Sequence, residues 1–574
     1  MHGLHEQRGV TLIDTLVGSA LMLLVFVGIA AAFRLSVEVV TNNKARAGAI
    51  ALANERMEYL RSLSYSQIGV IGGIPAGNVL QEEVVAYNGI DYTRRTMVLY
   101  SDDPGDGLGG ADANGIVADY KTIRVEINWV SKQGERGLTL VGRVSPFGIE
   151  TAVPGGTLTI NVVNEAAAPV VNAQVDIANT GTTPTINIRT YTNIDGSITF
   201  IGAPAASGYQ IVVSKTGYSS AQTYPVTVQN PNPDPRHLTV ADNQTTSANF
   251  TIDYVSTKMV ETFTQVREGT WTDPLTDTSK IEIMASTSVS AGVASLEAIA
   301  GAYEPYGFIR SVAVSPAILY RWKSFVAATS TPEATGILFR FYDNALALIP
   351  EGVLPGNSAG FATSTIDLSG ISTTTYQTLR VVSFLTSGDA NVTPSINSYS
   401  FVYEYGPEPF PNLSFTMRGA KTIGNSPTVY KYNQTHVSDA SARLTLSNIE
   451  ADTYTLGIAA STGYVLAESC NPQPETLLPA SSQTTKLYVL PLTTHTLLVD
   501  VRSNAGALLQ GATVELSKTG YDEMLTTSSC GQAFFEGLEN DIYTVTVSGS
   551  GYQQYTTNIT VNGATTLSAA LNPL

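Results

Sequence analysis

An apolar segment near the amino terminus restricts the fold of this chain more than any other sequence feature. It begins after Arg8, and Asp14 is the last charged residue before an uncharged stretch, 15–33. Those 19 residues would span roughly 28 Å as a helix, close to the thickness of the hydrocarbon core of a bilayer. A carboxylate at the edge of hydrocarbon is unfavourable by several kcal/mol unless it is paired. Asp14 therefore predicts a membrane-associated helix and a cationic partner for this one side chain.

The residues on either side of Asp14 resemble the amino terminus of type IV prepilins and the related pseudopilins. A short polar leader, residues 1–9, ends in Gly9, and the tetrapeptide Val-Thr-Leu-Ile separates it from the acid. In that family a membrane-embedded prepilin peptidase cuts after the glycine and methylates the new terminal amine, which here would be that of Val10. The acid then pairs with the terminal amine of a neighbouring subunit as the helices stack into a filament. The resemblance implies a precursor in the cytoplasmic membrane that has prepilin peptidase and other pilin subunits as partners.

Asp14 also departs from the family pattern, in which this residue is usually glutamate. Aspartate keeps the charge but is one methylene shorter, which fits a rare or terminal subunit better than a repeated one. Two other interpretations of the segment stay open. Residues 30–32, three alanines, could end a secretory signal peptide, or the helix could be an uncleaved anchor. The length of the uncharged stretch favours a bilayer crossing over the core of a signal peptide.

The helix is expected to continue beyond the membrane and to cover residues 10–64. In its second half the apolar residues Leu52, Met57 and Leu60 fall on one stripe, and no proline occurs before Pro75. This half should pack on a globular head.

Residues 65–153 are predicted to form that head as a small antiparallel sheet. Asn88-Gly89 is a strong hairpin signal because both residues accept positive φ angles. Residues 120–130 alternate between apolar and polar, and 138–144 can pair beside them. A long helix followed by a small sheet is the α+β architecture of pilins.

The composition favours antiparallel β modules outside the cell for the rest of the chain. Only 14% of the 574 residues are charged, whereas Thr, Ser, Val and Tyr are abundant and Gly and Pro recur at short intervals. The net charge of −17 disfavours nucleic acid as a partner, because affinity for phosphate comes from clustered Lys and Arg. The length predicts several domains.

A repeated pattern occurs three times in the sequence, and one of these three copies is degenerate. Each clear copy has a turn glycine, an aromatic residue three or four positions later, and a tyrosine-containing strand that leads to Gly-Tyr. The pattern resembles the carboxypeptidase regulatory-like or Cna B-like module, a seven-stranded prealbumin-type β-sandwich that usually serves as a stalk or spacer. Its fold alone does not define a function. We assign such sandwiches to residues 154–257, 407–493 (the degenerate copy) and 494–574.

Residues 258–406 lack the repeat, and their strand spacing predicts a jelly-roll-like β domain. The region after the pilin module is therefore expected to be all-β, with tandem β-sandwiches and a jelly-roll-like block between them. Aromatic residues in such a domain can stack on sugars, although they more often belong to the core. A surface glycan, or a receptor on a host or neighbouring cell, is thus a candidate partner. The aromatic residues considered are Trp271, Tyr303, Tyr306 and Trp322.

The acidic, glycine-rich loop 102–119 is a candidate Ca²⁺ site. Oxygen ligands at this density, between glycines that let the backbone curl, suit Ca²⁺. The loop lacks EF-hand spacing, and acidic loops are often only solvated turns. The resemblance adds that some pseudopilin heads carry structural calcium in a late loop. The candidate ligands are Asp102, Asp103, Asp106, Asp112, Asn114 and Asp119.

Cysteine and histidine give few signals of chemistry. Cys470 and Cys530 could form one disulfide in an oxidising compartment. His237, His436 and His495 have no neighbours in sequence that mark a catalytic or zinc site. We therefore expect no enzymatic activity and no cofactor other than Ca²⁺.

Together these features favour a minor, tip-located type IV pilin, a non-enzymatic filament subunit whose β domains project from the cell surface for adhesion or as spacers. More than 500 residues after the helix would be difficult to repeat at every step of a filament. One alternative is a pseudopilin of a type II secretion or DNA-uptake system, which has the same amino terminus but other partners. A further alternative is a surface-anchored carbohydrate-binding or carbohydrate-active protein, which would need a carboxylate pair at a cleft.

Overall fold

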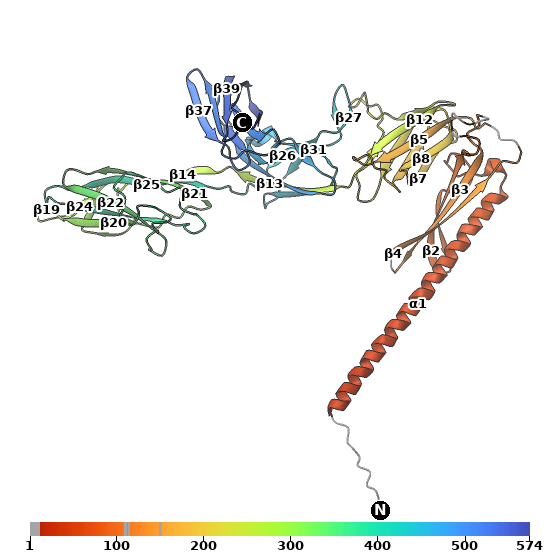
Figure 1. Cartoon of the computed structure of the whole chain (residues 1–574), viewed down its shortest axis with the longest axis horizontal. Coiled ribbons are helices and arrows are strands. Elements are labelled where there is room, and N and C mark those ends of the chain that lie inside the picture. Colours follow the sequence, from red (N-terminus) through yellow and green to blue (C-terminus); the bar gives the residue numbers. More distant parts are fainter. Residues whose placement is uncertain (1–11, 108, 110–111, 113–114, 133, 149–151) are drawn as a thin grey trace, which may run out of the picture. The chain divides into compact units, whose positions relative to one another are not determined.

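One long helix, α1 (Leu12–Ser62), precedes a body of β-strands (Figure 1). This arrangement confirms the predicted fold class, a helix with a small antiparallel sheet followed by an all-β region. The chain forms two compact units, the first made of residues up to 255 with the segment 422–431, and the second of residues 256–421 and 432–574. The computed structural model describes residues 12–107, 109, 112, 115–132, 134–148 and 152–574.

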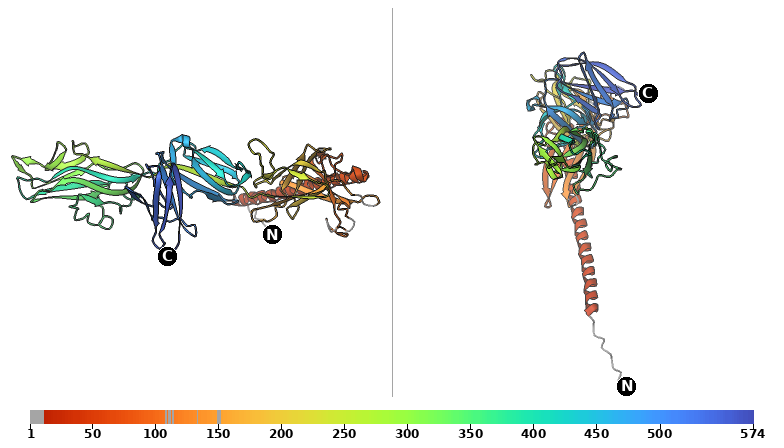
Figure 2. Two further views of the ribbon diagram at one scale, coloured as in Figure 1. Left: turned by 90° about the horizontal axis from the view of Figure 1, so that it is seen from above. Right: turned by 90° about the vertical axis from the view of Figure 1, so that its left-hand side faces the viewer.

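The two halves of α1 have different surroundings. Its first part projects beyond the sheet on which its last turns pack (Figures 1 and 2). The buried residues of the helix begin at Ala45 and include the predicted stripe of Leu52, Met57 and Leu60. At Gly48 the helix lies so close to the sheet that a Cβ atom on this residue would be 2.5 Å from the hydroxyl oxygen of Tyr92. The second half of α1 is therefore held by the head, whereas the apolar first half is not.

The head is a four-stranded antiparallel sheet in the order β1-β2-β3-β4. The turn between the first two strands is formed by Asn88 (φ 54°) and Gly89 (φ 77°), as their residue types predict. Ile123, Val125 and Ile127 on β3 are fully buried against α1 and the rest of the core. The strands are β1 (Glu82–Tyr87), β2 (Ile90–Ser101), β3 (Tyr120–Ser131) and β4 (Gly134–Val144), and the 3₁₀ helix η1 (Tyr65–Gln67) follows α1.

A buried lysine on β3 connects the head sheet to the segment that follows α1. Lys121 Nζ donates to the carbonyl oxygens of Tyr65 and Ile68, both at 2.7 Å. Burial lowers the pKa of Lys121 to about 8. Its hydrogen bonds tie η1 to β3.

The first sandwich completes the first unit. Its sheets have the orders β12-β5-β8 and β10-β9-β6-β7, with β11 paired to β9, and β12 runs parallel to β5. A hairpin from later in the chain, β27 and β28, belongs to this unit, since Asn230 Nδ2 and the Asp234 amide both donate to the carbonyl oxygen of Ile423. The strands are β5 (Gly156–Val163), β6 (Gln174–Asn179), β7 (Ile186–Tyr191), β8 (Ser197–Ala203), β9 (Ala206–Ser214), β10 (Ala221–Gln222), β11 (Leu238–Val240), β12 (Thr245–Thr251), β27 (Thr422–Gly424) and β28 (Val429–Tyr430).

The second sandwich begins earlier in the chain than the sequence pattern indicates. Strand β13 (Ser256–Thr264) lies mostly within the block that we assigned to the jelly-roll from residue 258, but it pairs with β30 and runs parallel to β34. The predicted boundary is wrong there because strand pairing joins residues far apart in sequence. The other strands of this sandwich are β26 (Ser414–Gly419), β29 (Asn433–Val437), β30 (Arg443–Ile449), β31 (Asp452–Ile458), β32 (Tyr464–Cys470), β33 (Glu475–Leu477) and β34 (Ser482–Pro491), with the 3₁₀ helix η3 (Ala460–Thr462).

The jelly-roll-like domain is thus inserted between β13 and β26 of the second sandwich. Its main sheets have the orders β16-β17-β25-β21-β23, with β14 on β25, and β15-β20-β24-β22. Its strands are β14 (Arg267–Asp273), β15 (Ile281–Ala285), β16 (Thr287–Ser290), β17 (Val293–Leu296), β18 (Ala298–Ile299), β19 (Ala302–Tyr303), β20 (Tyr306–Ser311), β21 (Leu319–Ser330), β22 (Thr335–Tyr342), β23 (Thr365–Asp367), β24 (Arg380–Ser387) and β25 (Ser395–Tyr405).

The third sandwich ends the chain. Its sheets have the orders β38-β35-β41 and β37-β36-β39-β40, and its first strand runs parallel to its last, as in the other two sandwiches. Its strands are β35 (Thr496–Ser503), β36 (Thr513–Lys518), β37 (Tyr521–Thr526), β38 (Gln532–Phe535), β39 (Asp541–Ser548), β40 (Tyr555–Val561) and β41 (Ala564–Leu571).

The repeated tyrosine has the same structural role in all three sandwiches. Tyr209, Tyr454 and Tyr543 are each buried in the core. Each hydroxyl donates to a backbone carbonyl four or five residues upstream, at 2.6, 2.8 and 3.4 Å respectively. A buried tyrosine needs such a partner, so the repeat identifies the corner where each of these strands enters its sheet.

Candidate functional site

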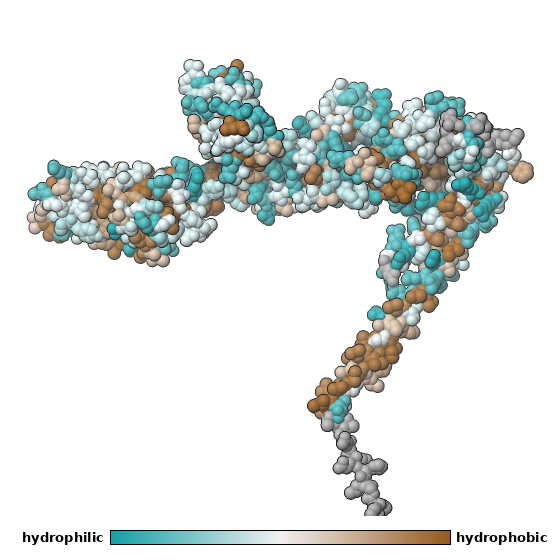
Figure 3. Space-filling view, viewed as in Figure 1, coloured by the Kyte–Doolittle hydropathy of each residue, from teal (hydrophilic) through white to brown (hydrophobic). Residues whose placement is uncertain are grey.

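The exposed first half of α1 is the candidate assembly site. It is long and apolar enough to cross a membrane, and its hydrophobic residues cover the first part of the helix in Figure 3. The hydroxyls of Ser19, Ser36 and Thr41 donate to helix carbonyls three or four residues upstream. A helix surrounded by lipid must satisfy its polar groups internally in this way.

Asp14 lies in the first turn of α1. A carboxylate is favoured there because the helix dipole places partial positive charge at this end. Gly9 and Val10, the predicted processing site, lie outside the described residues.

The acidic loop between β2 and β3 brings three of the predicted metal ligands together. Carboxylate oxygens of Asp102, Asp112 and Asp119 all lie within 4.8 Å of one another. Asp119 is 4% exposed. Asp103 is exposed and accepts a hydrogen bond from the Gly105 amide instead. Asp106 is not in the group, and Asn114 lies outside the described residues.

The geometry of this loop fits a divalent cation. Asp102 Oδ2 accepts a hydrogen bond from the Gly109 amide at 2.7 Å, whereas its Oδ1 is buried with no hydrogen-bond partner among the described residues. Asp112 Oδ1 accepts from the amides of Gly115 and Ile116. Three carboxylates gathered so closely repel one another, and a hard cation with oxygen ligands would remove the repulsion and satisfy the free Asp102 oxygen.

Cys470 and Cys530 form a disulfide between the second and third sandwiches, with their Cα atoms 4.9 Å apart. Two hydrogen bonds lie beside it. The Ser469 amide donates to Gln532 Oε1 at 2.7 Å, and Ser528 donates to Glu468. Burial raises the pKa of Glu468. The two sandwiches of the second unit are thus joined covalently.

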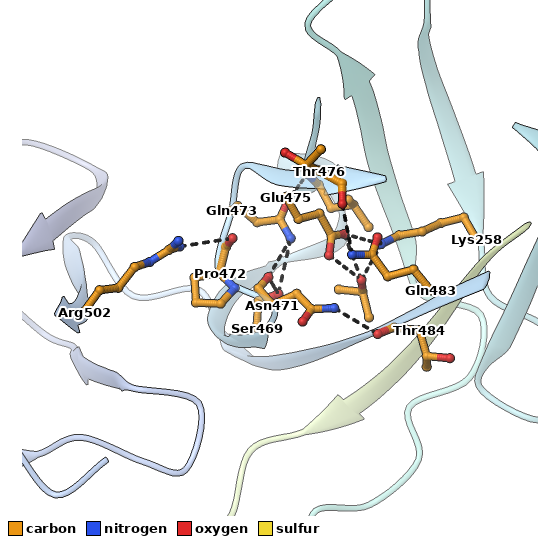
Figure 4. A network of polar contacts seen from close by, with 12 residues as sticks. Lys258, Ser469, Asn471, Pro472, Gln473, Glu475, Thr476, Gln483, Thr484 and Arg502 are labelled. Carbon is orange, nitrogen blue, oxygen red and sulfur yellow. Dashed lines mark hydrogen bonds and ion pairs between the residues drawn. The ribbon is translucent and has the colours of Figure 1, made fainter. Parts of the chain in front are cut away.

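The second sandwich also contains a buried ion pair that sequence reasoning missed. Lys258 Nζ lies 2.5 Å from Glu475 Oε1, and it also donates to Gln483 Oε1 and Thr485 Oγ1. Figure 4 shows Lys258, Glu475 and Gln483 pointing toward one another. Burial lowers the pKa of Lys258, and the carboxylate of Glu475 opposes this shift.

The only available sequence signal was the position of Lys258 in β13. It shares a strand face with the buried residues Val260 and Thr262. A lysine on a buried face requires a partner, but nothing in the sequence identifies Glu475 as that partner.

The aromatic residues considered for sugar stacking are differently placed. Trp322 is fully buried and donates from Nε1 to the carbonyl oxygen of Tyr376, so it is a core residue. Trp271 and Tyr303 pack against the same core. Tyr306 is 49% exposed, the most of the four, and its ring stacks on that of Phe384.

Two histidines are engaged in local contacts. His237 Nδ1 lies 2.9 Å from the hydroxyl of Thr223, and His436 Nε2 lies 2.8 Å from that of Tyr432. Burial lowers the pKa of both imidazoles. In the jelly-roll domain, Glu282 forms ion pairs with Arg310 and Arg380.

Comparison with known proteins identifies the class of the last domain. Residues 496–572 match the carboxypeptidase regulatory-like domain family. This stretch is the third sandwich, so the chain contains a carboxypeptidase regulatory-like domain at this position. No curated protein has a sequence that matches the chain.

Several solved structures resemble the chain at low identity. The Bacillus anthracis TIE protein is 10% identical, with 86% of this chain and 74% of that chain covered and a TM-score of 0.15. BcpA, the major pilin subunit of Bacillus cereus, is 10% identical, with 73% and 100% covered and a TM-score of 0.13. A streptococcal ancillary pilin is 9% identical, with 73% and 99% covered and a TM-score of 0.14. These values are too low to support an inference about function.

Proposed function

We propose that this chain is a minor, tip-located type IV pilin, a non-enzymatic subunit of a surface filament. The observation that carries the proposal is α1, whose apolar first half is exposed and has Asp14 in its first turn, while its second half packs on a four-stranded sheet. Such a helix has one part for the membrane or filament and one part for the head. The β domains after the head then serve as a spacer and as an adhesive surface outside the cytoplasm.

Mass spectrometry of the mature amino terminus tests this proposal. Prepilin processing removes residues 1–9 and leaves a chain that begins with a methylated Val10. A chain that begins after Ala32 would instead identify a cleaved signal peptide, and an intact Met1 would identify a simple anchor. Either of these results would reject the proposal.

We also propose that the acidic loop binds Ca²⁺ and thereby stabilises the head. Asp102, Asp112 and Asp119 would hold the ion, which supplies positive charge where their carboxylates converge. Ca²⁺ at about 100 times its Kd is expected to stabilise the head by about 2.7 kcal/mol relative to the chain in EGTA. Thermal unfolding of the head measures this difference.

The Asp119→Asn variant should lose the response to Ca²⁺, because it removes one charge from the group. Asp91→Asn is the matched control, since Asp91 is an exposed aspartate at the start of β2. If EGTA leaves the unfolding of the wild-type head unchanged, the loop is a solvated turn.

A further inference from the structure

A groove lies where α1 separates from the head sheet, within the first unit. The hydroxyl of Tyr92 donates to the carbonyl oxygen of Ala45 at 2.9 Å, and the buried residues of the helix begin at Ala45. On the amino-terminal side of this contact, the helix and the ends of the head strands line a groove of about 610 Å³. A space of this size accommodates a small ligand or one end of a larger one.

The apolar part of the lining comes from both sides of the groove. The helix contributes Phe33 and Val37, and the head contributes Trp129 and Val130. Trp129 is buried, with its ring 6.0 Å from that of Tyr92, so it forms a fixed wall. The other three side chains are exposed and continue the hydrophobic surface of the first half of α1 as far as the head (Figure 3).

Three charged residues line the groove: Arg34, Glu38 and Lys132. Arg34 and Lys132 are exposed, and Glu38 is half-buried. Neither cation forms an ion pair with a residue that the structure describes. Two cations and one carboxylate give the groove a formal charge of +1, in a chain whose net charge is −17. The groove is therefore a favourable place for an anionic group.

The position of the groove relative to a bilayer follows from the helix. The uncharged stretch, 15–33, ends at the residue before Arg34, so Arg34 lies at the edge of the hydrocarbon core when this stretch spans it. From Arg34 to Glu38 the helix rises by about 6 Å, and each headgroup layer of a bilayer is about 5–8 Å thick. Lys132, which directly follows β3, adds a cation from the head to the same groove. The groove therefore opens in the headgroup layer.

We propose that this groove binds one anionic phospholipid of the leaflet at which α1 leaves the membrane. The phosphate lies against Arg34 and Lys132, and the acyl chains run back along Phe33 and the apolar half of α1. Arginine can donate two parallel hydrogen bonds to a phosphate, and each cation near a membrane surface strengthens the binding of anionic lipid about five-fold. The inference rests on the proposed insertion of α1 in the membrane and is independent of filament assembly.

Competition between two lipids for the full-length chain tests this site. The chain, purified in a non-ionic detergent, is incubated with equal concentrations of dioleoylphosphatidylglycerol and dioleoylphosphatidylcholine, which share their acyl chains and differ in headgroup charge. Native mass spectrometry then identifies the lipid that remains bound. Bound phosphatidylglycerol should exceed bound phosphatidylcholine at least about ten-fold. Arg34→Gln and Lys132→Gln should each reduce this ratio about three- to five-fold, and the double variant should bring it close to one.

Two further variants serve as controls. Lys44 is an exposed lysine of α1 that does not line the groove, so Lys44→Gln should keep the wild-type ratio. Thr41→Trp fills the groove from the helix side and should reduce bound phosphatidylglycerol at least about ten-fold, because the lipid and the indole ring cannot occupy the same space. Lys132→Gln separates the groove from a general effect of charge beside a membrane helix, since Lys132 belongs to the head.

The proposal is overturned if the two lipids bind equally, if no lipid remains bound, or if Lys132→Gln or Thr41→Trp behaves like the wild type. It is also overturned if the chain forms lipid-free dimers that Thr41→Trp abolishes, because the groove then receives α1 of a second copy. Equal binding of the two lipids by a chain that is processed to a methylated Val10 refutes only this inference. Selective binding by a chain that keeps Met1 in the cell refutes only the proposed function.

Discussion

Replacing Glu475 with glutamine is expected to lower the free energy of unfolding of the second sandwich by about 3–5 kcal/mol. The side chains of Lys258 and Glu475 are only 0% and 4% exposed, so the substitution leaves a buried ammonium group without its counter-ion. Breaking one side of a buried pair has this effect because the remaining charge cannot be solvated. Hydrogen exchange of peptides from β13, β33 and β34, followed by mass spectrometry, measures the change within the whole chain.

Two further variants define the cause of this loss. The double substitution Lys258→Met with Glu475→Leu should recover most of the stability, because apolar residues of similar volume often replace a buried pair without loss. Glu404→Gln breaks a more exposed pair with Arg321 in the jelly-roll domain and should cost less than about 1 kcal/mol. If Glu475→Gln costs no more than Glu404→Gln, the buried pair does not stabilise this sandwich.

The loss should also depend on pH. Burial lowers the pKa of Lys258 below its ordinary value of 10.5, so in the interval between the two values the unfolded state binds more protons than the folded state. Stability therefore rises with pH across that interval. In Glu475→Gln the carboxylate that opposes the lowering is absent and the interval is wider. The difference from the wild type should consequently shrink as the pH is raised.

Local patterns in the sequence predicted the elements that depend on local chemistry. Asn88-Gly89 marks a hairpin because its two positive φ angles are set by residue type. The repeated tyrosines mark equivalent corners because a buried hydroxyl needs a nearby carbonyl, and the chain supplies one a few residues upstream. In both cases the deciding contact spans only a few residues.

The features that sequence reasoning missed depend on contacts between distant residues. Lys258 and Glu475 are 217 residues apart, and the jelly-roll domain is inserted between them. The pairing of β13 with β34 crosses the same interval, which is why the first strand of the second sandwich was assigned to its neighbour.

The acidic loop could be predicted from the sequence only in part. Its density of carboxylates is visible in the sequence, but which of them converge is set by the turns. Asp103 accepts a hydrogen bond from the Gly105 amide, whereas Asp119 is buried immediately before β3 and lies close to Asp102 and Asp112. A loop of this kind can be located from its composition, and its ligand set needs the structure.

Replacing Asp14 with alanine is expected to reduce incorporation of the chain into filaments at least about ten-fold, because the terminal amine of the neighbouring subunit then lies in an apolar environment without a counter-charge. Asp14→Glu keeps the charge and lengthens the side chain by one methylene, so it should retain or increase incorporation. Quantitative immunoblotting of sheared filaments, relative to the membrane fraction, measures both effects.

The Asp14 variants separate assembly from processing. Each variant should have the same mature amino terminus as the wild type, as judged by mass spectrometry, since the substitution is meant to act after cleavage. Asp91→Ala removes an exposed carboxylate from the head and should leave incorporation unchanged. If Asp14→Ala enters filaments as well as Asp91→Ala does, the carboxylate makes no assembly contact, and the exposed half of α1 must be assigned to membrane anchoring alone.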